Sequence, residues 1–179
     1  MAKDINDDIT LSKPVIEMAT VANEYCYYLE NIEKKEKDEV FEFLQRILPL
    51  LYLKGSLLPS LEPEYPEANE RFVTEEQWER IFTTLRDKFE KDDEYWIIDP
   101  QYINETEPLK ASLSENMTDI YQDMKDFIYL LQKNTLAARE NAINQCKILH
   151  GNHWGYRVGN LTTRLHHLIY FNEEIESPF

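Results

Sequence analysis

The sequence predicts an all-α fold, a single-domain bundle of about six helices with two long crossover loops. Apolar residues recur at intervals of three and four along most of the chain, which is the pattern of amphipathic helices. Alternating, strand-like patterns are rare. A length of 179 residues suits one domain with a hydrophobic core better than two. We therefore expect residues 1–179 to form one helical domain in which residues 1–11 are flexible.

The first two helices are indicated by their apolar residues. The first extends over about residues 14–32, with Pro14 in its first turn, where a missing N–H group costs little. The second extends over about residues 40–54 and is apolar almost all round toward its end, which predicts a central position. Pro49 lies inside this second helix, so a kink or a break is expected there.

Two segments are expected to be the long connections. Residues 55–73 contain three closely spaced prolines, which cannot continue a helix. Residues 92–113 contain Trp96 in an aromatic run beside acidic residues, and this run could form one short extended segment. Two interpretations of the second connection stay open. It is either a crossover that packs Trp96 on the bundle or, since long ordered loops are often functional, a flap over a pocket.

The other helices begin at recognisable capping residues. The segment Thr74-Glu-Glu-Gln77 is a capping box, so a third helix should begin directly after Thr74. Either Ser112 or Ser114 should cap a fourth helix that ends near residue 133. A fifth helix is expected over about residues 135–149, and a sixth should follow the glycine-containing stretch and end near residue 171.

The composition limits the classes of partner. The net charge of −15 would repel nucleic-acid phosphates and anionic membrane surfaces. No segment approaches the roughly 18 apolar residues of a membrane span, and the first residues lack the pattern of a secretory signal. Cys26 and Cys146 stand alone in helical patterns and are expected to be buried free thiols. We expect a cytoplasmic protein that binds neither nucleic acid nor membrane.

Two polar faces define a candidate site between the fourth and sixth helices. The fourth helix carries a row of aspartates, and the sixth carries a face with arginines, histidines and an asparagine but no acid. The candidate residues are Asp119, Asp123, Asp126, His153, Arg157, Asn160, Arg164 and His167. Either Arg157 and Arg164 form ion pairs with the aspartates, or the two faces line a cleft that holds an anionic ligand.

Small residues define another face of the sixth helix. Gly155, Gly159, Thr162 and His166 share this face. Glycine in a helix costs stability, so its presence indicates close approach to a neighbouring helix. On this interpretation, replacing Gly159 with leucine should destabilise the fold.

No nucleophilic triad, phosphate-binding loop or dinucleotide motif is present, and no cofactor is expected. One alternative is a magnesium site. Glu39, Glu42, Asp123 and Asp126 resemble the paired carboxylates with which all-helical nucleoside-triphosphate pyrophosphohydrolases hold Mg²⁺ against a substrate phosphate. The spacing of the two pairs and the presence of aspartate where glutamate is usual depart from that pattern.

Two segments resemble a bacterial family classed as domain of unknown function 5063. They are Asp119-Ile-Tyr121-Gln-Asp123-Met-Lys-Asp126, and His153-Trp154-Gly155 followed by Leu165-His166. The resemblance covers most of the chain and implies a compact, mainly helical cytosolic domain, but it supplies no activity.

The sequence therefore leaves the function unassigned and favours an acidic cytosolic binding or regulatory module, with a protein or a small anionic ligand as its partner. Whether it is also an enzyme stays open. One alternative is a magnesium-dependent phosphohydrolase that would use Asp119, Asp123 and Asp126. Another is an immunity-type protein, whose acidic surface would neutralise a basic partner.

Overall fold

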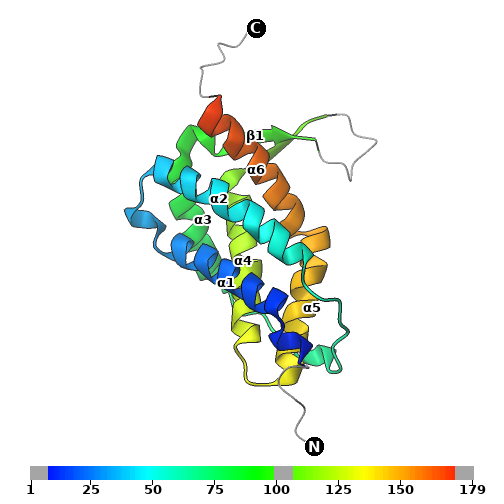
Figure 1. Ribbon diagram of the computed structural model, residues 1–179. Helices are drawn as coiled ribbons and strands as arrows, with labels where there is room; N and C mark the ends of the chain where they lie inside the picture. The colour runs from blue at the N-terminus through cyan, green and yellow to red at the C-terminus, as the bar shows by residue number, and fades with distance from the viewer. Residues whose placement is uncertain (1–7, 99–106, 172–179) are drawn as a thin grey trace, which may run out of the picture.

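Six α-helices make up most of residues 8–98 and 107–171, the part of the chain that the computed structural model describes. They are α1 (Lys13–Glu30), α2 (Lys37–Ser56), α3 (Glu75–Phe89), α4 (Leu113–Leu131), α5 (Leu136–Asn152) and α6 (Trp154–Tyr170). The predicted all-α bundle is confirmed (Figure 1). No helix of the described ranges is both long and apolar enough to cross a bilayer.

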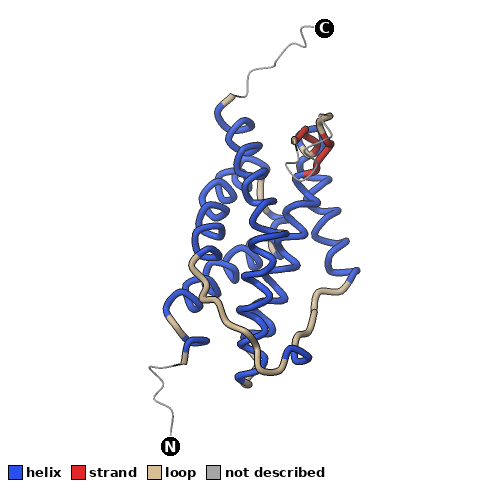
Figure 2. The backbone as a smooth tube through the Cα atoms, turned by 90° about the vertical axis from the view of Figure 1, so that its right-hand side faces the viewer, coloured by secondary structure: helices blue, strands red, loops and turns tan. Residues whose placement is uncertain are grey.

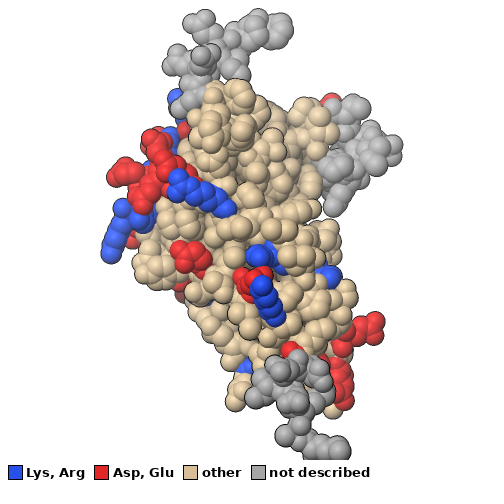
Figure 3. All heavy atoms as spheres, viewed as in Figure 1, with Lys and Arg blue, Asp and Glu red and all other residues tan. Residues whose placement is uncertain are grey.

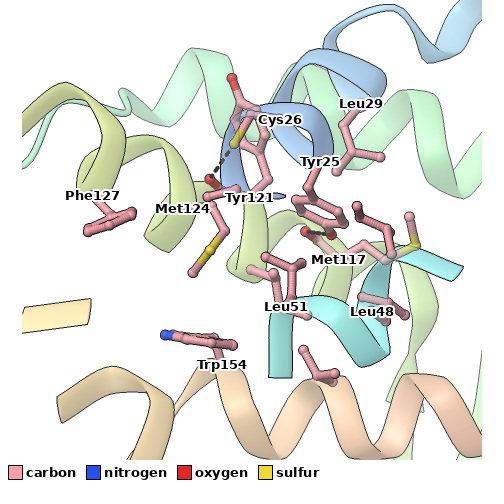
Figure 4. Packing of buried hydrophobic residues seen from close by; sticks show 14 of the residues in the cluster. Tyr25, Cys26, Leu29, Leu48, Leu51, Met117, Tyr121, Met124, Phe127 and Trp154 are labelled. Carbon is pink, nitrogen blue, oxygen red and sulfur yellow. Dashed lines mark hydrogen bonds between the residues drawn. The ribbon is translucent and has the colours of Figure 1, made fainter. Parts of the chain in front are cut away.

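The centre of the bundle is α4, which packs against α1, α3, α5 and α6. Figure 4 shows side chains from α1, α2, α4 and α6 converging on one apolar core. The hydroxyl of Tyr25 donates a hydrogen bond of 2.8 Å to the carbonyl of Met117, so even the buried phenol has a partner. Trp154 is fully buried at the start of α6. The core thus fixes α6 on α4, where the candidate polar faces meet.

The prediction that α2 is central is wrong. One side of α2 is buried, but Leu50, Leu53 and Leu57 are exposed on the other. In Figure 3 much of the face over α2 is uncharged, and charged side chains gather toward one edge. The helix also continues unbroken through Pro49, against the expectation of a break. Pro49 lies on the exposed side, where water can satisfy the carbonyl that lacks a helical donor.

The predicted caps of α3 and α4 are present. The N–H of Gln77 donates to Oγ1 of Thr74 over 3.2 Å, and the Thr74 N–H donates to Oε1 of Gln77 over 3.1 Å, which completes the capping box. Ser112 rather than Ser114 caps α4, because its Oγ accepts the N–H of Glu115 over 3.1 Å. These local signals fix where the two helices begin.

The chain start is only partly described. Residues 1–7, which fall in the segment expected to be flexible, lie outside the described residues. Ile9–Leu11 form a short 3-10 helix instead of a loose segment. Arg139 of α5 holds it, with Nε 2.8 Å from Oγ1 of Thr10 and a terminal nitrogen 3.0 Å from Oδ2 of Asp8.

The second long connection contains a β-hairpin, formed by β1 (Glu94–Ile97) and β2 (Leu109–Ser112). The strands are antiparallel, with Glu94 opposite Ser112 and Ile97 opposite Leu109. Residues 99–106 between them lie outside the described part. Figure 2 shows the hairpin at one end of the bundle.

The hairpin presents Trp96 outward. Trp96 is 68% exposed, so the interpretation in which it packs on the bundle is wrong. Its neighbour Tyr95 is 7% exposed and points inward instead, since successive side chains of a strand alternate between faces. The buried carboxylate of Asp93 ties the hairpin to α4, with Oδ1 accepting the Ser114 N–H over 2.7 Å and Oδ2 accepting the Ser112 hydroxyl over 2.8 Å.

The close approach of helices occurs at Gly55 and not at Gly159. Gly159 is exposed and a Cβ atom there would meet nothing within 4 Å, so the expected small-residue contact at this position is wrong. A Cβ atom at Gly155 would lie 2.2 Å from the His150 carbonyl oxygen. A Cβ atom at Gly55 would lie 2.2 Å from the Trp154 ring. Gly55 therefore allows α2 to contact α6.

Candidate functional site

The aspartate face of α4 and the basic face of α6 meet at the start of α6. Nδ1 of His153 lies 2.6 Å from Oδ2 of Asp123, and Nε of Arg157 lies 3.0 Å from Oδ2 of Asp119. Asp119 and Asp123 are four positions apart and lie one above the other on α4, whereas His153 directly precedes α6 and Arg157 lies in its first turn. The predicted ion pairing is confirmed for Arg157.

Two further hydrogen bonds support the pair of Arg157 and Asp119. The indole N–H of Trp78 donates to Oδ1 of Asp119 over 3.2 Å. A terminal nitrogen of Arg157 donates to the His153 carbonyl over 3.3 Å. The Asp123 side chain is 3% exposed, so the contact with His153 gives this buried carboxyl group a polar partner. These four side chains therefore hold α6 against α4.

Asp126 has a different role from the other two aspartates. Its Oδ1 accepts the N–H groups of Phe72 and Val73, over 2.7 Å and 2.9 Å, which anchors the proline-containing connection to α4. Burial raises the pKa of the Asp126 carboxyl, although these two hydrogen bonds oppose the shift. Its Oδ2 is buried without a partner among the described residues. A cavity of about 20 Å³ beside Asp126 has room for one water molecule.

Arg164 does not pair with an aspartate side chain, so the second predicted ion pair is wrong. A terminal nitrogen of Arg164 donates to the main-chain carbonyl of Asp92 over 3.3 Å. The guanidinium carbon lies 6.0 Å from the centre of the Tyr95 ring. No carboxylate of the described ranges forms an ion pair with Arg164, and its Nε is buried without an acceptor there. Arg164 therefore contacts the chain at and just before the hairpin instead of an α4 aspartate.

A groove of about 540 Å³ lies between β1 and α6. One wall consists of residues 94–98 and the other of Asn160, Thr163, Arg164 and His167. This volume is in the range of ligand sites, about 300–1,000 Å³. Three predicted site residues, Asn160, Arg164 and His167, thus lie in the groove, whereas the aspartates, His153 and Arg157 do not line it.

The groove combines exposed apolar side chains with an arginine and a histidine. Trp96 and Ile98 are 68% and 74% exposed, respectively. Among the described residues that line the groove, Glu94 is the only acid, and its Oε2 lies 2.6 Å from Nζ of Lys110. Arg164 and His167 on the opposite wall are free of such pairing with acids of the described chain. The arrangement suits a ligand with an anionic group next to an apolar one.

The hairpin wall is the part of the groove that the sequence did not predict as a site. The sequence feature that could have indicated this wall is the aromatic run that contains Trp96, because one interpretation of that run was a flap over a pocket. A second hollow, of about 290 Å³, lies on the other side of the hairpin and shares Ile97 and Asn160 with the groove. Arg157 lines this second hollow. Asn160 therefore lies at the point where the two hollows adjoin.

The four carboxylates proposed for Mg²⁺ do not form one site. Glu39 pairs with Lys35, and Glu42 pairs with Arg46 on the surface of α2. Asp123 contacts His153, and Asp126 accepts the N–H groups of Phe72 and Val73. Across residues 8–98 and 107–171, no group of three or more histidine, cysteine, aspartate or glutamate side chains could hold a metal ion.

The two cysteines are buried free thiols, as expected. Burial raises the pKa of both the Cys26 and the Cys146 thiol, which keeps them protonated at neutral pH. The Sγ atom of Cys26 lies 3.9 Å from the Tyr121 carbonyl in the core (Figure 4). Neither thiol therefore has the character of a nucleophile or a metal ligand.

One protein family and one solved structure are similar to this chain over most of its length. Residues 9–171 match the sequence profile of a family described as domain of unknown function (DUF5063). The crystal structure of protein BF1032 from Bacteroides fragilis is similar, with 33% sequence identity and a TM-score of 0.82 over 93% of this chain and 98% of that chain. No protein with a curated description matches.

Proposed function

The chain belongs to the family described as domain of unknown function (DUF5063), and we propose that it is a binding module with its site in the groove between β1 and α6. The family description and the name of the Bacteroides fragilis protein state no activity. The proposal therefore rests on the geometry of the groove. Its ligand carries an anionic group beside an apolar one, and a cytoplasmic location belongs to the same proposal.

The observation that carries the proposal is the state of Arg164. Its Nε is buried without an acceptor in the described structure, and leaving such a donor unsatisfied costs about 1–3 kcal/mol. Arg164 lies on one wall of the groove while Trp96 is exposed on the other. Arginine and tryptophan are the residue types that most often dominate binding energy. An anionic ligand in the groove would pair with the Arg164 guanidinium and cover Trp96.

The two alternative functions fit the site less well. An immunity-type protein would present acids to a basic partner, but the groove presents Arg164 and His167, and the α4 aspartates are engaged. A magnesium-dependent phosphohydrolase would need clustered carboxylates, and Glu39 and Glu42 pair with neighbouring cations instead. We therefore propose binding alone.

The test uses benzoate as a probe and uncharged benzamide as its matched control. The indole N–H groups of Trp78 and Trp154 already donate hydrogen bonds, so the Trp96 indole is the one that a groove ligand would reach. Benzoate should shift the Trp96 indole and Arg164 Nε–H resonances in ¹H–¹⁵N spectra, and benzamide should not. Absence of these shifts, or equal shifts with benzamide, would contradict the proposal.

Two variant pairs control for indirect effects. His167→Ala and Trp96→Ala should weaken benzoate binding, whereas His166→Ala and Tyr27→Ala, which change exposed residues outside the groove, should not. A parallel thermal-shift measurement adds Mg²⁺ and nucleotides. A rise in melting temperature with Mg²⁺ would favour the phosphohydrolase alternative instead.

A further inference from the structure

We infer that the groove accepts an extended peptide segment of a partner protein, which adds to the free edge of β1 as a third strand and places one acidic side chain at Arg164. This inference rests on the proposed function and specifies its ligand. It follows from the backbone of β1, from the charges of the opposite wall and from the exposed side chains between them.

The groove runs along the edge of β1. Residues 94–98 line it consecutively, and no residue of β2 does. Because neighbouring side chains of a strand point to opposite faces, all four residues of β1 can line one groove only along the strand edge. In the described part of the chain, β1 pairs with β2 alone. Alternate residues of β1 therefore direct their N–H and C=O groups away from β2 and toward the groove.

An open strand edge is the template to which extended peptides add. Proteins usually cover or blunt such an edge, because it invites pairing with another chain. Where an edge stays open beside a helix, the main-chain hydrogen bonds give affinity and the flanking side chains give specificity. Here α6 forms the wall opposite β1, so an added strand would lie between β1 and α6.

The exposed side chains define which peptide fits. Trp96 of β1 and Ile98, directly after the strand, both expose large apolar side chains. Cross-strand pairs with aromatic or β-branched residues stabilise a sheet, so apolar residues at alternate peptide positions would cover them. Arg164 would pair with an acidic residue on the side of the peptide that faces α6. The peptide alternates apolar and polar residues and carries one acid.

The overall charge argues for a single acid and against an acidic tail. The chain has a net charge of −15, which repels strongly acidic partners, while Arg164 attracts only within its immediate surroundings. A small organic anion would satisfy Arg164 but would leave the β1 edge unpaired. The edge therefore favours a peptide over a small molecule.

The experiment selects binders from a phage-displayed library of random heptapeptides, with the full chain as bait. Selected peptides are synthesised with a fluorescent label, and their affinity is measured by fluorescence polarisation. We expect alternating apolar residues and one acid. Methylation of alternate peptide N–H groups should weaken binding about tenfold or more, while methylation of the intervening ones should not, because only alternate groups face β1.

A second readout tests the acidic contact. Arg164→Gln should weaken binding of the acidic peptide about tenfold and should not change binding of the same peptide with glutamine in place of its acid. Because Arg164 also contacts Asp92, the exposed positions supply variants that leave folding intact: Trp96→Ala should weaken binding, and Tyr27→Ala should not.

Each other outcome overturns the inference. Selection of no binders, loss of binding without the alternating methylation pattern, or insensitivity to Arg164→Gln and Trp96→Ala would each exclude strand addition at β1. If benzoate binds the groove and no peptide does, the binding function stands and the peptide inference fails. If neither binds, both proposals fail.

Discussion

Gly55 of α2 lies directly against the Trp154 ring of α6, and a Cβ atom at position 55 would approach Cη2 of that ring to 2.2 Å. Trp154 cannot move away easily, because it is fully buried and its indole N–H donates to the Cys146 carbonyl over 3.1 Å. The contact between α2 and α6 therefore depends on the absence of a side chain at position 55. It helps to hold the helix that forms one wall of the groove.

Gly55→Ala should lower the free energy of unfolding by about 1–3 kcal/mol, the usual cost of inserting a group into a packed core. Chemical denaturation measures this change. The matched control is Gly159→Ala, which should raise the free energy of unfolding by about 0.5–1 kcal/mol, because that helical position has open space. Equal stability of Gly55→Ala and the unmodified protein would show that the two helices separate without cost.

The Asp123–His153 pair should show energetic coupling in a double-mutant cycle. Asp123 is buried, so His153→Ala leaves its carboxylate without this partner and should cost about 1–3 kcal/mol. The coupling energy with Asp123→Ala should be about 0.5–3 kcal/mol. The exposed pair Glu42–Arg46 is the control and should couple by less than about 0.5 kcal/mol. Additive effects at Asp123 and His153 would contradict the structural role.

The helices could be predicted because their signals are local. The capping box at Thr74 and the cap at Ser112 depend on residues within one turn, and both are present. The position of α2 could not be predicted in this way. Its apolar residues are nearly continuous in sequence, and which side is buried depends on where α1 and α6 pass. The close contact at Gly55 was missed because it joins residues far apart in the chain.

The meeting of the α4 and α6 faces was predictable for similar reasons. The α4 and α6 faces could be read from helical spacing, and the pairing of Arg157 with Asp119 follows from it. Arg164 was assigned the wrong partner because the hairpin reaches this part of α6, and hairpin placement depends on tertiary contacts such as that of Asp93 with Ser114. Whether the groove binds a ligand stays a prediction.

Asp126 should tolerate asparagine better than alanine. Asp126→Ala removes the acceptor for the N–H groups of Phe72 and Val73 and should cost about 1–3 kcal/mol. Asp126→Asn keeps an oxygen for them and removes a charge whose burial is unfavourable, so its stability at neutral pH should be close to that of the unmodified protein. Unfolding curves and hydrogen exchange of the two N–H groups measure the difference. Equal destabilisation by both variants would show that the charge itself matters.

His150 should make the protein less stable as the pH falls. Its ring packs between Tyr52 and Trp154, with centroid distances of 4.8 Å and 4.7 Å, and burial lowers the pKa of the imidazole below its usual range. The folded state therefore binds this proton less readily than the unfolded state. The stability contribution is complete above the ordinary histidine pKa of about 6.5 and is lost as the pH falls toward the folded-state pKa.

His150→Phe keeps the aromatic contacts but cannot take up a proton. Unfolding by urea at several pH values should therefore show a smaller loss of stability for the variant than for the unmodified protein between about pH 7 and pH 5. Above about pH 7 the difference between the two proteins should be constant, which provides an internal control because the imidazole is then neutral in both states. Parallel profiles over the whole range would mean that His150 takes up its proton as readily in the fold as in the unfolded chain.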